Sequence, residues 1–427
     1  MTNKPLIKCL ELYIDHRGVT PHKLNVDWSE SGYPVLSANN VKDEGITKTE
    51  EIRFIDEITY KKWMDVEIQR NDILMTSEAP AGQTYLWNSD EKIVVGQRLY
   101  ALRTKKDVDP KYLTYYLKST TGQREIERYC SGSTVFGISA KTFDFITVKL
   151  PETLQEQQRI GNILFIIDSK IENNNRINAE LESLTKLIYD YWFVQFNFPD
   201  KNGKPYKSNG GKMVWNERLS REIPDGWKVD SLEDKIDFQR GISYSSDDIK
   251  DNNGTPMINL ASIGRRKNYI PEGIKHCKGL FKENDIVKFG DMLLACTDLT
   301  RLAEIIGCPI WVPISNKGFI YSMDLAKIII LDTALIPSYL YMTLRTDHYH
   351  KYIKGFASGT NVLHLNLNGV KWYTISFPLK ELQIKFHKLV SPMFQAIQEN
   401  TLESKELKSI RDFLLPMLMN GQVKIKS

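Results

Sequence analysis

The sequence predicts a mixed α/β (α+β) fold in which two similar α/β domains are separated by two long, antiparallel, coiled-coil-like helices. Two observations predict this fold. Short segments recur in the same order at a nearly constant spacing, and a long amphipathic stretch with a narrow apolar stripe follows each copy. With 427 residues, 41% hydrophobic and 26% charged, the chain is globular and long enough for two or three domains.

The first observation is an internal repeat. Matching segments occur in the same order in both halves: 35–41 with 257–263, 71–75 with 290–294, 110–113 with 337–340, 131–135 with 358–362, and Pro151 with Pro378. The first pair is separated by 222 residues and the last three pairs by 227. Single matches of this length arise by chance, whereas an ordered series at near-constant spacing indicates a duplication.

The second observation is an apolar stripe that advances in alternating steps of mostly four and three residues. The stripe comprises Ile160, Leu164, Ile167, Ile171, Leu181, Leu184 and Ile188 in the first copy, and Phe386, Val390, Met393, Ile397, Leu407, Ile410 and Leu414 in the second. Such a stripe is typical of coiled-coil helices, and two such helices would bury their stripes together. The alternative is that each helix packs only on its own domain. Polar Asn174, Asn178 and Asn400 interrupt the stripe and are expected to fix the register while weakening the seam.

These observations divide the chain into five segments. A first α/β domain at 1–151 is followed by a long helix at 152–198, a polar connector at 199–221, a second α/β domain at 222–378, and a final helix at 379–427. At 1.5 Å per residue, helices of about 40 residues would span about 60 Å. We therefore expect the helix pair to act as a spacer of fixed length.

Charge and cysteine content leave the partner open but restrict the compartment. The net charge of +4 neither indicates nor excludes nucleic-acid binding, since phosphate contacts need only a local basic face. The five cysteines are scattered and form no C-x-x-C pair, so neither a disulfide framework nor a zinc site is expected. The sequence has no apolar stretch of about 18 residues and no secretory signal, so we expect a cytoplasmic protein without a membrane segment.

Several catalytic motifs are absent from the sequence. It contains no Pro-Pro dipeptide, which an adenine methyltransferase needs to hold its target base, no G-x-G turn, and no G-x-x-x-x-G-K-[ST] phosphate loop. A nuclease is harder to exclude: Asp225 with the Glu-Asp-Lys segment at 233–235 weakly resembles a nuclease constellation, although such residues are ordinary at surface turns. His348 and His350 have no acidic or cysteine partner at metal-ligand spacing, so no metal site is expected.

Three stretches carry a family resemblance: PETLQEQQRI at 151–160, the segment 192–196 with the connector at 202–208, and IPDGW at 223–227. Together with the repeat, they resemble the specificity subunits of type I restriction-modification systems over essentially the whole chain. The resemblance implies two target recognition domains, each reading one half of a bipartite, asymmetric site in double-stranded DNA. It also implies that the helix pair sets the gap between the halves and that the chain has no catalytic site of its own.

The same resemblance implies partners and cofactors. Two methyltransferase subunits are expected to dock beside the helices and to carry S-adenosylmethionine. Restriction subunits are expected to supply translocation and cleavage with ATP and Mg, and this chain is expected to bind no cofactor itself. Two rigidly spaced readers would measure a distance along the duplex, while the DNA between them would be touched only through phosphates or shape.

Loops that leave buried strands are where such a reader would contact bases. The loops after 71–75 and 290–294, the basic run 265–267, two glycine turns and two Arg-Gly turns are therefore candidates. The DNA-facing candidates are Arg17, Lys42, Thr76, Ser77, Gln83, Ser131, Ser133, Thr134, Arg240, Arg265, Arg266, Lys267, Thr297, Thr300, Arg301, Ser358, Thr360 and Asn361. For each, the alternative is a residue that only closes a turn or carries a solvated charge.

Three other functions stay open at this point. An interaction scaffold would use the helices for protein partners and the domains for peptides, and would show no salt-sensitive binding to DNA. An enzyme with an unrecognised site would methylate or cleave DNA without other subunits. A specificity subunit of a related methylation-based phage-defence system would keep the fold and lack type I cleavage.

Overall fold

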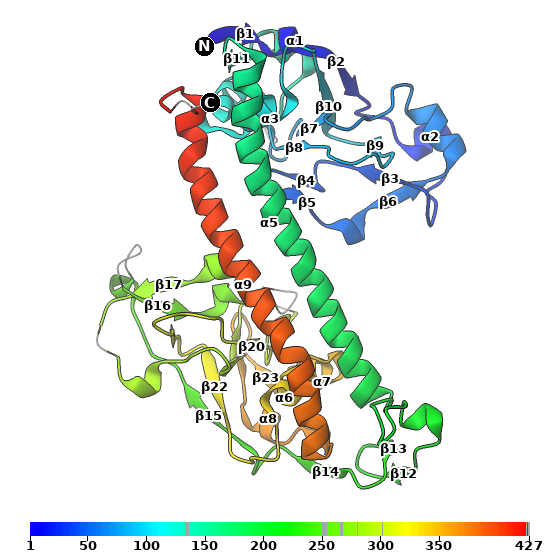
Figure 1. Ribbon diagram of the computed structural model, residues 1–427, viewed down its shortest axis with the longest axis vertical. Coiled ribbons are helices and arrows are strands. Elements are labelled where there is room, and N and C mark those ends of the chain that lie inside the picture. The colour runs from blue at the N-terminus through cyan, green and yellow to red at the C-terminus, as the bar shows by residue number, and fades with distance from the viewer. Residues whose placement is uncertain are drawn as a thin grey trace. The chain divides into compact units, whose positions relative to one another are not determined.

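The computed structural model describes residues 1–132, 136–249, 254–264, 268–279, 281–300, 302–423 and 425 (Figure 1). The chain forms two compact units: unit 1 comprises Met1–Asn173 with Ser404–Ser427, and unit 2 comprises Asn174–Glu403. The two long helices are α5 (Leu154–Tyr189) and α9 (Lys380–Met419), and each unit contains a section of both. The predicted mixed α/β fold with two long helices is confirmed.

Unit 1 is built around a four-stranded antiparallel sheet with the order β2-β10-β7-β8. A three-stranded sheet has the order β6-β3-β9, β1 pairs with β11, and β4 pairs with β5. The strands are β1 (Thr2–Pro5), β2 (Leu10–Asp15), β3 (Tyr33–Leu36), β4 (Val41–Lys42), β5 (Gly45–Ile46), β6 (Arg53–Ile55), β7 (Ile73–Thr76), β8 (Thr84–Leu86), β9 (Val94–Val95), β10 (Leu99–Thr104) and β11 (Thr147–Leu150). The short helices are α1 (Leu6–Cys9), α2 (Glu57–Trp63), α3 (Pro110–Lys118) and α4 (Thr120–Arg128).

Unit 2 has a four-stranded sheet with the order β15-β22-β18-β20 and three-stranded sheets with the orders β17-β16-β21 and β19-β24-β23. β14 pairs with β25, and β12 pairs with β13. The strands are β12 (Met213–Asn216), β13 (Arg221–Pro224), β14 (Lys228–Ser231), β15 (Ile236–Arg240), β16 (Thr255–Ile258), β17 (Lys275–Cys277), β18 (Met292–Ala295), β19 (Thr297–Asp298), β20 (Pro309–Trp311), β21 (Ile320–Tyr321), β22 (Leu325–Ile330), β23 (Ala357–Ser358), β24 (Leu363–Leu365) and β25 (Thr374–Phe377). The short helices are α6 (Pro337–Leu344), α7 (Asp347–Ile353) and α8 (Asn368–Lys371).

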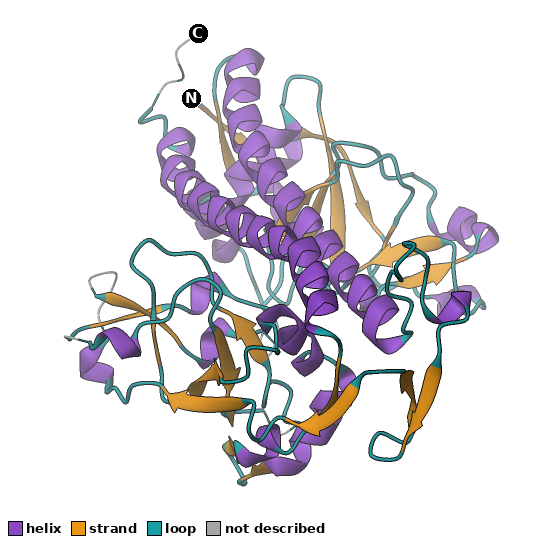
Figure 2. Ribbon diagram, turned by 60° about the horizontal axis from the view of Figure 1, so that its bottom comes forward, coloured by secondary structure: helices purple, strands orange, loops and turns teal. Residues whose placement is uncertain are grey.

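The four-stranded sheet and one three-stranded sheet have the same strand order in both units. The order β2-β10-β7-β8 corresponds to β15-β22-β18-β20, and β6-β3-β9 corresponds to β17-β16-β21. In both three-stranded sheets the central strand has a parallel neighbour, with Val35 opposite Val94 and Met257 opposite Ile320. Figure 2 shows short helices and strands mixed in both globular regions. The duplication predicted from the sequence is therefore confirmed.

Each four-stranded sheet is covered on both faces. In β7, Ile73 and Met75 belong to one buried cluster and Leu74 to another, because successive side chains of a strand point to opposite faces. In β18 the residues from Met292 to Ala295 alternate between two clusters in the same way. Burial on both faces explains why these strands read as unbroken apolar runs in the sequence.

A buried glutamine in the first turn of each long helix anchors that helix to its own domain. Gln157 Oε1 accepts the Asp109 N–H at 3.0 Å, and its Nε2 donates to the carbonyl of the proline before the helix. Gln383 repeats both contacts, with the Ile336 N–H at 3.0 Å. Both side chains are buried, so each amide needs these partners, and the shared need explains why glutamine occurs at both positions.

In unit 2 the sections of α5 and α9 run in opposite directions, because later residues of α5 contact earlier residues of α9. Asn178 Nδ2 donates to Ile397 O at 3.3 Å, and the rings of Tyr189 and Phe386 lie 6.2 Å apart. In unit 1, the first turns of α5 and the last turns of α9 share one buried cluster. The predicted packing of the two helices against each other is observed within each unit.

The predicted polar residues of the stripe meet one another in unit 2. Asn174 Nδ2 donates to Glu403 Oε2 at 2.7 Å, and Asn400 Nδ2 donates to Asn178 Oδ1 at 2.9 Å. Both bonds run between the two helices. A polar cluster at one level of an otherwise apolar seam is satisfied in one register only, which supports the predicted role of these asparagines.

The predicted apolar stripe is wrong at one matched position in each helix. Leu184 and Ile410 are 42% and 48% exposed, and their neighbours Thr185 and Arg411 face the partner helix. The cause is geometric: a helix with 3.6 residues per turn drifts by about 20° per heptad from a strict 3.5-residue repeat, so the contact line moves by one residue. Of the remaining stripe, Ile160, Leu164, Ile171, Phe386 and Val390 are buried, and Ile167, Leu181, Ile188, Met393, Ile397, Leu407 and Leu414 are partly buried.

The helix ends and the connector also differ from the sequence prediction. The first long helix is shorter than 152–198 and continues as a π-helical turn at Asp190–Val194. The connector at 199–221 is not only a polar link, because it contains strand β12, which pairs with β13 at its end and has Met213 and Val214 packed on the core of unit 2. A run of only three apolar residues, Met213 to Trp215, among Gly, Lys and Asn was too short a pattern to predict a strand.

Candidate nucleic-acid interface

The loops that follow β7 and β18 occupy equivalent places in the two units. In unit 1 the loop is closed by backbone hydrogen bonds from Gly82 N to Thr76 O and from Thr76 N to Gln83 O, both at 2.9 Å. In unit 2 the same two bonds join Ala295 with Gly307 and Cys308. We name the enclosed segments, 77–82 and 296–307, reading loop 1 and reading loop 2. They start from the same strand position but differ in length and sequence.

Reading loop 1 is braced by side chains that the sequence suggested for DNA contact. Thr76 is buried; its Oγ1 donates to Pro80 O at 2.6 Å and accepts the Gln83 N–H at 3.0 Å. Ser77 is also buried, at 2% exposure. Gln83 is partly exposed, and its Oε1 accepts the Asp43 N–H at 3.3 Å. Thr76 and Ser77 therefore shape the loop, and Gln83 is the one of these three with exposed surface.

Reading loop 2 is organised by the buried carboxylate of Asp298. It accepts the N–H groups of Thr300, Ile305 and Ile306 at 2.6, 2.7 and 3.0 Å. Thr297 is buried beside it. Three backbone donors on one carboxylate hold the loop in a single conformation. Thr300 is partly exposed at its tip, and Arg301 lies outside the described residues.

Three exposed apolar side chains in or near these loops were missed by the sequence analysis. Leu299 and Leu302 of reading loop 2 are 66% and 72% exposed, and Phe136, beside the first glycine turn, is 65% exposed. Apolar side chains on loops suit the methyl group of thymine or the faces of bases. The available signal was an apolar residue between polar loop residues, which in sequence is indistinguishable from a core position.

The two matched arginines, Arg17 and Arg240, differ in how far their charge is paired. Arg17 forms a two-pronged pair with Asp15, Nε to Oδ1 at 2.8 Å and Nη2 to Oδ2 at 2.9 Å, and lies over the Tyr100 ring. The hydrogen bond to Asp15 raises the pKa of Arg17. Arg240 is exposed and donates to Met323 O at 3.1 Å. Arg240 thus carries more uncompensated charge than Arg17.

The β4–β5 hairpin carries Lys42 in unit 1, where Lys42 Nζ donates to Ala38 O at 3.2 Å. Unit 2 has an antiparallel bridge between Ile263 and Tyr269 at the matching place. Of the DNA-facing candidates, Arg265, Arg266 and Lys267 fall between these two bridge residues and lie outside the described residues.

The two glycine turns have the backbone conformation that requires glycine. Gly132 and Gly359 have φ values of 139° and 128°, and a Cβ on Gly359 would collide with the Val362 carbonyl. Ser131 is exposed at the first turn. At the second turn Ser358, Thr360 and Asn361 are exposed, while Ser133 and Thr134 of the first turn lie outside the described residues.

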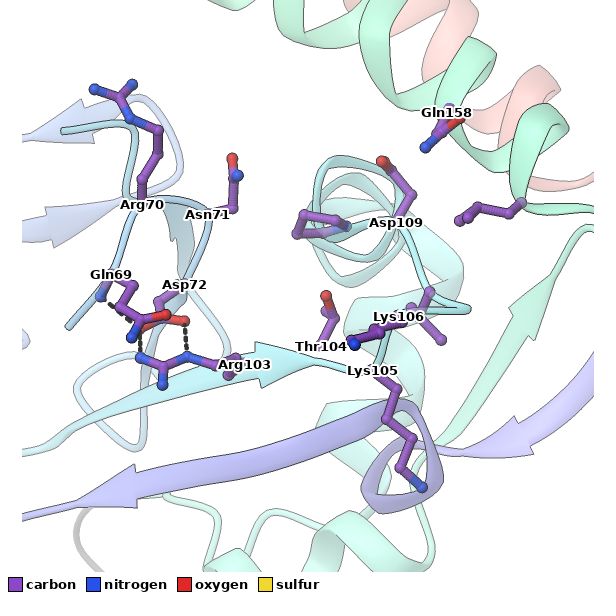
Figure 3. Close-up of a pocket in the computed structure, with 13 residues that line it drawn as sticks. Gln69, Arg70, Asn71, Asp72, Arg103, Thr104, Lys105, Lys106, Asp109 and Gln158 are labelled. Carbon is purple, nitrogen blue, oxygen red and sulfur yellow. Dashed lines mark hydrogen bonds and ion pairs between the residues drawn. The ribbon is translucent and has the colours of Figure 1, made fainter. Parts of the chain in front are cut away.

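A hollow of about 260 Å³ lies at the other end of β7 in unit 1 (Figure 3). Its residues 69–72 precede β7, whereas reading loop 1 follows it. Arg103 at its edge is paired with both carboxylate oxygens of Asp72, at 2.9 and 2.7 Å, and Arg70 is paired with Asp90 at 2.7 Å. Because these arginines are already compensated, we do not assign the hollow to DNA reading.

Other polar groups singled out in the sequence are part of ordinary surface structure. Asp225 pairs with Lys212 at 2.9 Å, and Lys235 lies 3.6 Å from Asp230, so these two of the suggested nuclease groups have local partners. Within the described part of the chain, no three His, Cys, Asp or Glu side chains are grouped to hold a metal ion. The helices among the described residues include none with the length and apolarity needed to cross a membrane.

The chain therefore contains two copies of one α/β domain, and each copy is joined to both long helices. The strands repeat between the copies, whereas the loop that follows β7 or β18 differs, so this is a duplicated protein that presents a different loop from each copy. The family model for the type I restriction modification DNA specificity domain matches residues 11–183 and 224–410. These two matches span most of the chain and coincide with the two copies of the repeat. The chain belongs to the family of type I restriction-modification DNA specificity proteins.

Curated relatives agree with this assignment. The chain is 26% identical over 370 residues to the specificity subunit of the type I restriction enzyme MjaIX of Methanocaldococcus jannaschii, covering 84% of this chain and 78% of that protein. It is 24% identical over 402 residues to the HindI specificity subunit of Haemophilus influenzae, covering 83% and 87%. The fold is similar to the crystal structure of a type I S subunit from M. genitalium, with a TM-score of 0.64, 17% identity and 98% and 95% coverage.

Proposed function

We propose that this chain is the DNA-reading subunit of a type I restriction-modification complex, with one half of a bipartite site read by each unit. The observation that carries the proposal is the pair of reading loops: two matched strands, β7 and β18, present segments of different length and sequence from the same position. Two copies of one framework with different loops suit two different half-sites. The proposed DNA site is therefore asymmetric.

The long helices are proposed to set the gap between the half-sites. α5 and α9 contain 36 and 40 residues, so at 1.5 Å per residue each is about 54 to 60 Å long. A rigid element of this length fixes a spacing, as dimeric DNA readers do. In this scheme the bases of the gap are not read directly, and phosphate contacts there would only orient the protein.

Two methyltransferase subunits are proposed to dock on two matched apolar rows. Leu184 and Leu187 near the end of α5 are 42% and 61% exposed, and Ile410 and Phe413 near the end of α9 are 48% and 62% exposed. The two pairs are separated by the same 226 residues. A surface present twice with the same spacing fits two copies of one partner. Exposed apolar rows on long helices are also unusual unless a partner covers them.

The chemistry is proposed to lie on the partners. The docked methyltransferase subunits would bind S-adenosylmethionine and transfer its methyl group, and restriction subunits would use ATP and Mg for translocation and cleavage. In this proposal the chain binds no cofactor and contributes only the site. A related methylation-based defence system would use the same chain without the cleavage step.

The docking proposal is tested by native mass spectrometry of the chain with its methyltransferase subunit. With Leu187→Asp or Phe413→Asp we expect one methyltransferase copy instead of two, and none with both changes. Ile166→Asp, a control at an isoleucine of α5 that is 66% exposed and outside the rows, should keep two copies. Two copies bound to the double variant would contradict the docking proposal.

The reading proposal is tested by mapping N6-methyladenine across the genome of a host without adenine methylation. The chain is expressed with its adjacent methyltransferase subunit, and then with either protein omitted. We expect a two-part motif with a gap of fixed length, which disappears when either protein is left out. A contiguous motif, or methylation that does not depend on this chain, would contradict the proposal and favour a scaffold function.

A further inference from the structure

A set of largely buried charged side chains, each still partly exposed, joins the first domain to the long helices in unit 1. Asp168 of α5 accepts hydrogen bonds from Arg411 Nη1 of α9 and from the Tyr115 hydroxyl, both at 2.8 Å. Lys118 Nζ, at the end of α3, lies 3.7 Å from the same carboxylate. The side chains of Lys118, Asp168 and Arg411 are 11%, 22% and 18% exposed. We name these three residues the junction triad.

The junction triad reaches the start of β8 and the β4–β5 hairpin through Asp43. Lys118 Nζ donates to the Asp43 carbonyl at 2.6 Å. Asp43 lies in the hairpin turn, where its Oδ1 accepts the Thr84 N–H at 2.8 Å and its N–H donates to Gln83 Oε1 at 3.3 Å. Two DNA-facing candidates are therefore linked to Lys118 through Asp43: Lys42 precedes Asp43 in the chain, and Gln83 accepts its N–H.

Burial makes these contacts selective for one conformation. Desolvation lowers the pKa of Lys118 against the opposing effects of Asp168 and Asp43, and desolvation raises the pKa of Asp43. A poorly solvated charge depends on its partners, and loss of one partner leaves the others uncompensated. The hairpin turn is therefore held to the helices more firmly than hydrogen bonds exposed to water would hold it.

Unit 2 has different side chains at the positions that match the junction triad. In the order Lys118, Asp168 and Arg411, the matching residues are Arg345, Phe394 and Thr185. Arg345 Nη1 donates to the Tyr341 hydroxyl at 2.7 Å, and the Phe394 ring lies 5.1 Å from Trp311. The junction of unit 2 thus keeps a cation, which lies 4.0 Å from Glu182 of α5, but it has an aromatic ring in place of the Asp168 carboxylate. An effect of the junction triad on DNA reading should accordingly be confined to the half-site of unit 1.

We infer that the junction triad positions the hairpin turn and reading loop 1, and thereby determines how strictly one half of the DNA site is read. Lys118, Asp168 and Arg411 are positioning residues in this scheme, because their charges are directed at one another and at the Asp43 carbonyl. The inference rests on the proposed function and adds to it the residues that keep one reader in place.

Lys118→Met tests the inference, because it removes the ammonium group and keeps the length of the side chain. In the methylation map we expect sites with one wrong base in a single half to gain about tenfold relative to the correct site, while the other half keeps its discrimination. A well-placed base contact discriminates by roughly 1–3 kcal/mol, or about 5- to 150-fold, so partial misplacement accounts for a tenfold change. Lys118→Arg, which keeps a cation, should restore most of the discrimination.

Lys111→Met is the matched control. Lys111 lies on the same helix, but its ammonium group donates to Asn162 of α5 at 2.8 Å and lies over the Phe165 ring rather than at the hairpin. It should leave both half-sites unchanged. A general loss of stability would lower methylation at all sites alike, whereas the inference requires relaxation of one half only.

The outcomes separate the inference from the proposed function. If Lys118→Met keeps both halves strict, or relaxes both equally, the inference is wrong. If Lys118→Met does not fold, Asp43→Asn replaces it, because this change weakens the contact to Thr84 and leaves the junction triad intact; the same relaxation of one half is expected. If the unchanged chain gives no two-part motif, the proposed function is wrong. If the unchanged chain gives the two-part motif and Lys118→Met does not alter it, only the inference is wrong.

Discussion

The junctions between domain and helices in unit 1 and unit 2 use the same arrangement of strands and helices but are filled by different side chains. In unit 1 the centre of the junction is Asp168, bound by Arg411 and Tyr115. At the position that matches Asp168, unit 2 has Phe394, which packs with Trp311 at 5.1 Å and with a third ring at 5.5 Å. After the duplication, the framework of strands was retained while the side chains that fill the junction diverged.

The feature that the two junctions share is a pair of side-chain contacts to the backbone at the start of each long helix. The buried glutamines Gln157 and Gln383 each bind one N–H and the carbonyl of the preceding proline. Such contacts depend on main-chain atoms, which every neighbouring sequence supplies. The contacts at Asp168 and Phe394 depend instead on sets of side chains, and one set can be replaced by another of similar volume. Conserved backbone anchoring thus permits divergent junction chemistry.

The largest difference between the junctions should follow from Trp311→Ala. Trp311 is 6% exposed, and removing a buried aromatic ring costs about 3–5 kcal/mol through lost burial and the cavity left behind. We expect hydrogen–deuterium exchange to show reduced protection of β18, β20 and α6 with little change in unit 1. The control is Trp215→Ala, at a tryptophan that is 59% exposed, which should stay within about 0.5 kcal/mol of the unchanged chain. Equal loss of protection in both units would contradict separate junctions.

A smaller and equal effect is expected from Gln157→Ala and Gln383→Ala. Each change leaves a buried backbone N–H unpaired, and such a group costs about 1–3 kcal/mol. Because the two glutamines make the same contacts, the losses in unfolding free energy, measured by exchange of α5 or α9 peptides, should agree within about 1 kcal/mol. Gln158→Ala, at the exposed neighbour, is the control. A large loss for one glutamine and none for the other would show that the shared anchoring is not equivalent.

The smallest effect is a pH dependence specific to unit 1. Lys118 faces Asp168, Asp43, Arg411 and Glu44, and desolvation lowers its pKa below the ordinary value of 10.5 that it recovers on unfolding. Between these two values the unfolded chain binds more protons, so the unfolding free energy of unit 1 should rise with pH in that window. Lys118→Met should remove this rise. The urea midpoint of the unchanged chain minus that of Lys118→Met should rise with pH across this window. If this difference stays constant or falls, the assigned burial of Lys118 is contradicted.

The duplication and the long helices were predictable because they depend on patterns that repeat over many residues. The sequence predicted the strands at Pro34 and Pro256 and the helix starts at Pro110 and Pro337. It also showed the alternation of apolar residues. Local sequence preferences and the overall fold agree at these positions, and such agreement is what makes an element predictable.

Individual site residues were less predictable because their roles depend on neighbours that are distant in sequence. Thr76 was a DNA-facing candidate, yet its hydroxyl is used to close reading loop 1. Lys118 carried no sequence signal, since its partner Asp43 is 75 residues away. Leu184 was placed in the seam by a strict heptad count, whereas the actual helix drifts away from that count. Loop polarity indicates exposure only on average.

The central claim, that unit 1 and unit 2 each read one half of one DNA site, is tested most directly by exchanging segment 222–378 for that of a relative with a different specificity. The hybrid chain is expressed with the same methyltransferase subunit, and N6-methyladenine is mapped across the genome. The account predicts that one half of the two-part motif changes while the other half and the gap length stay the same. A change in both halves, or in neither, would contradict it.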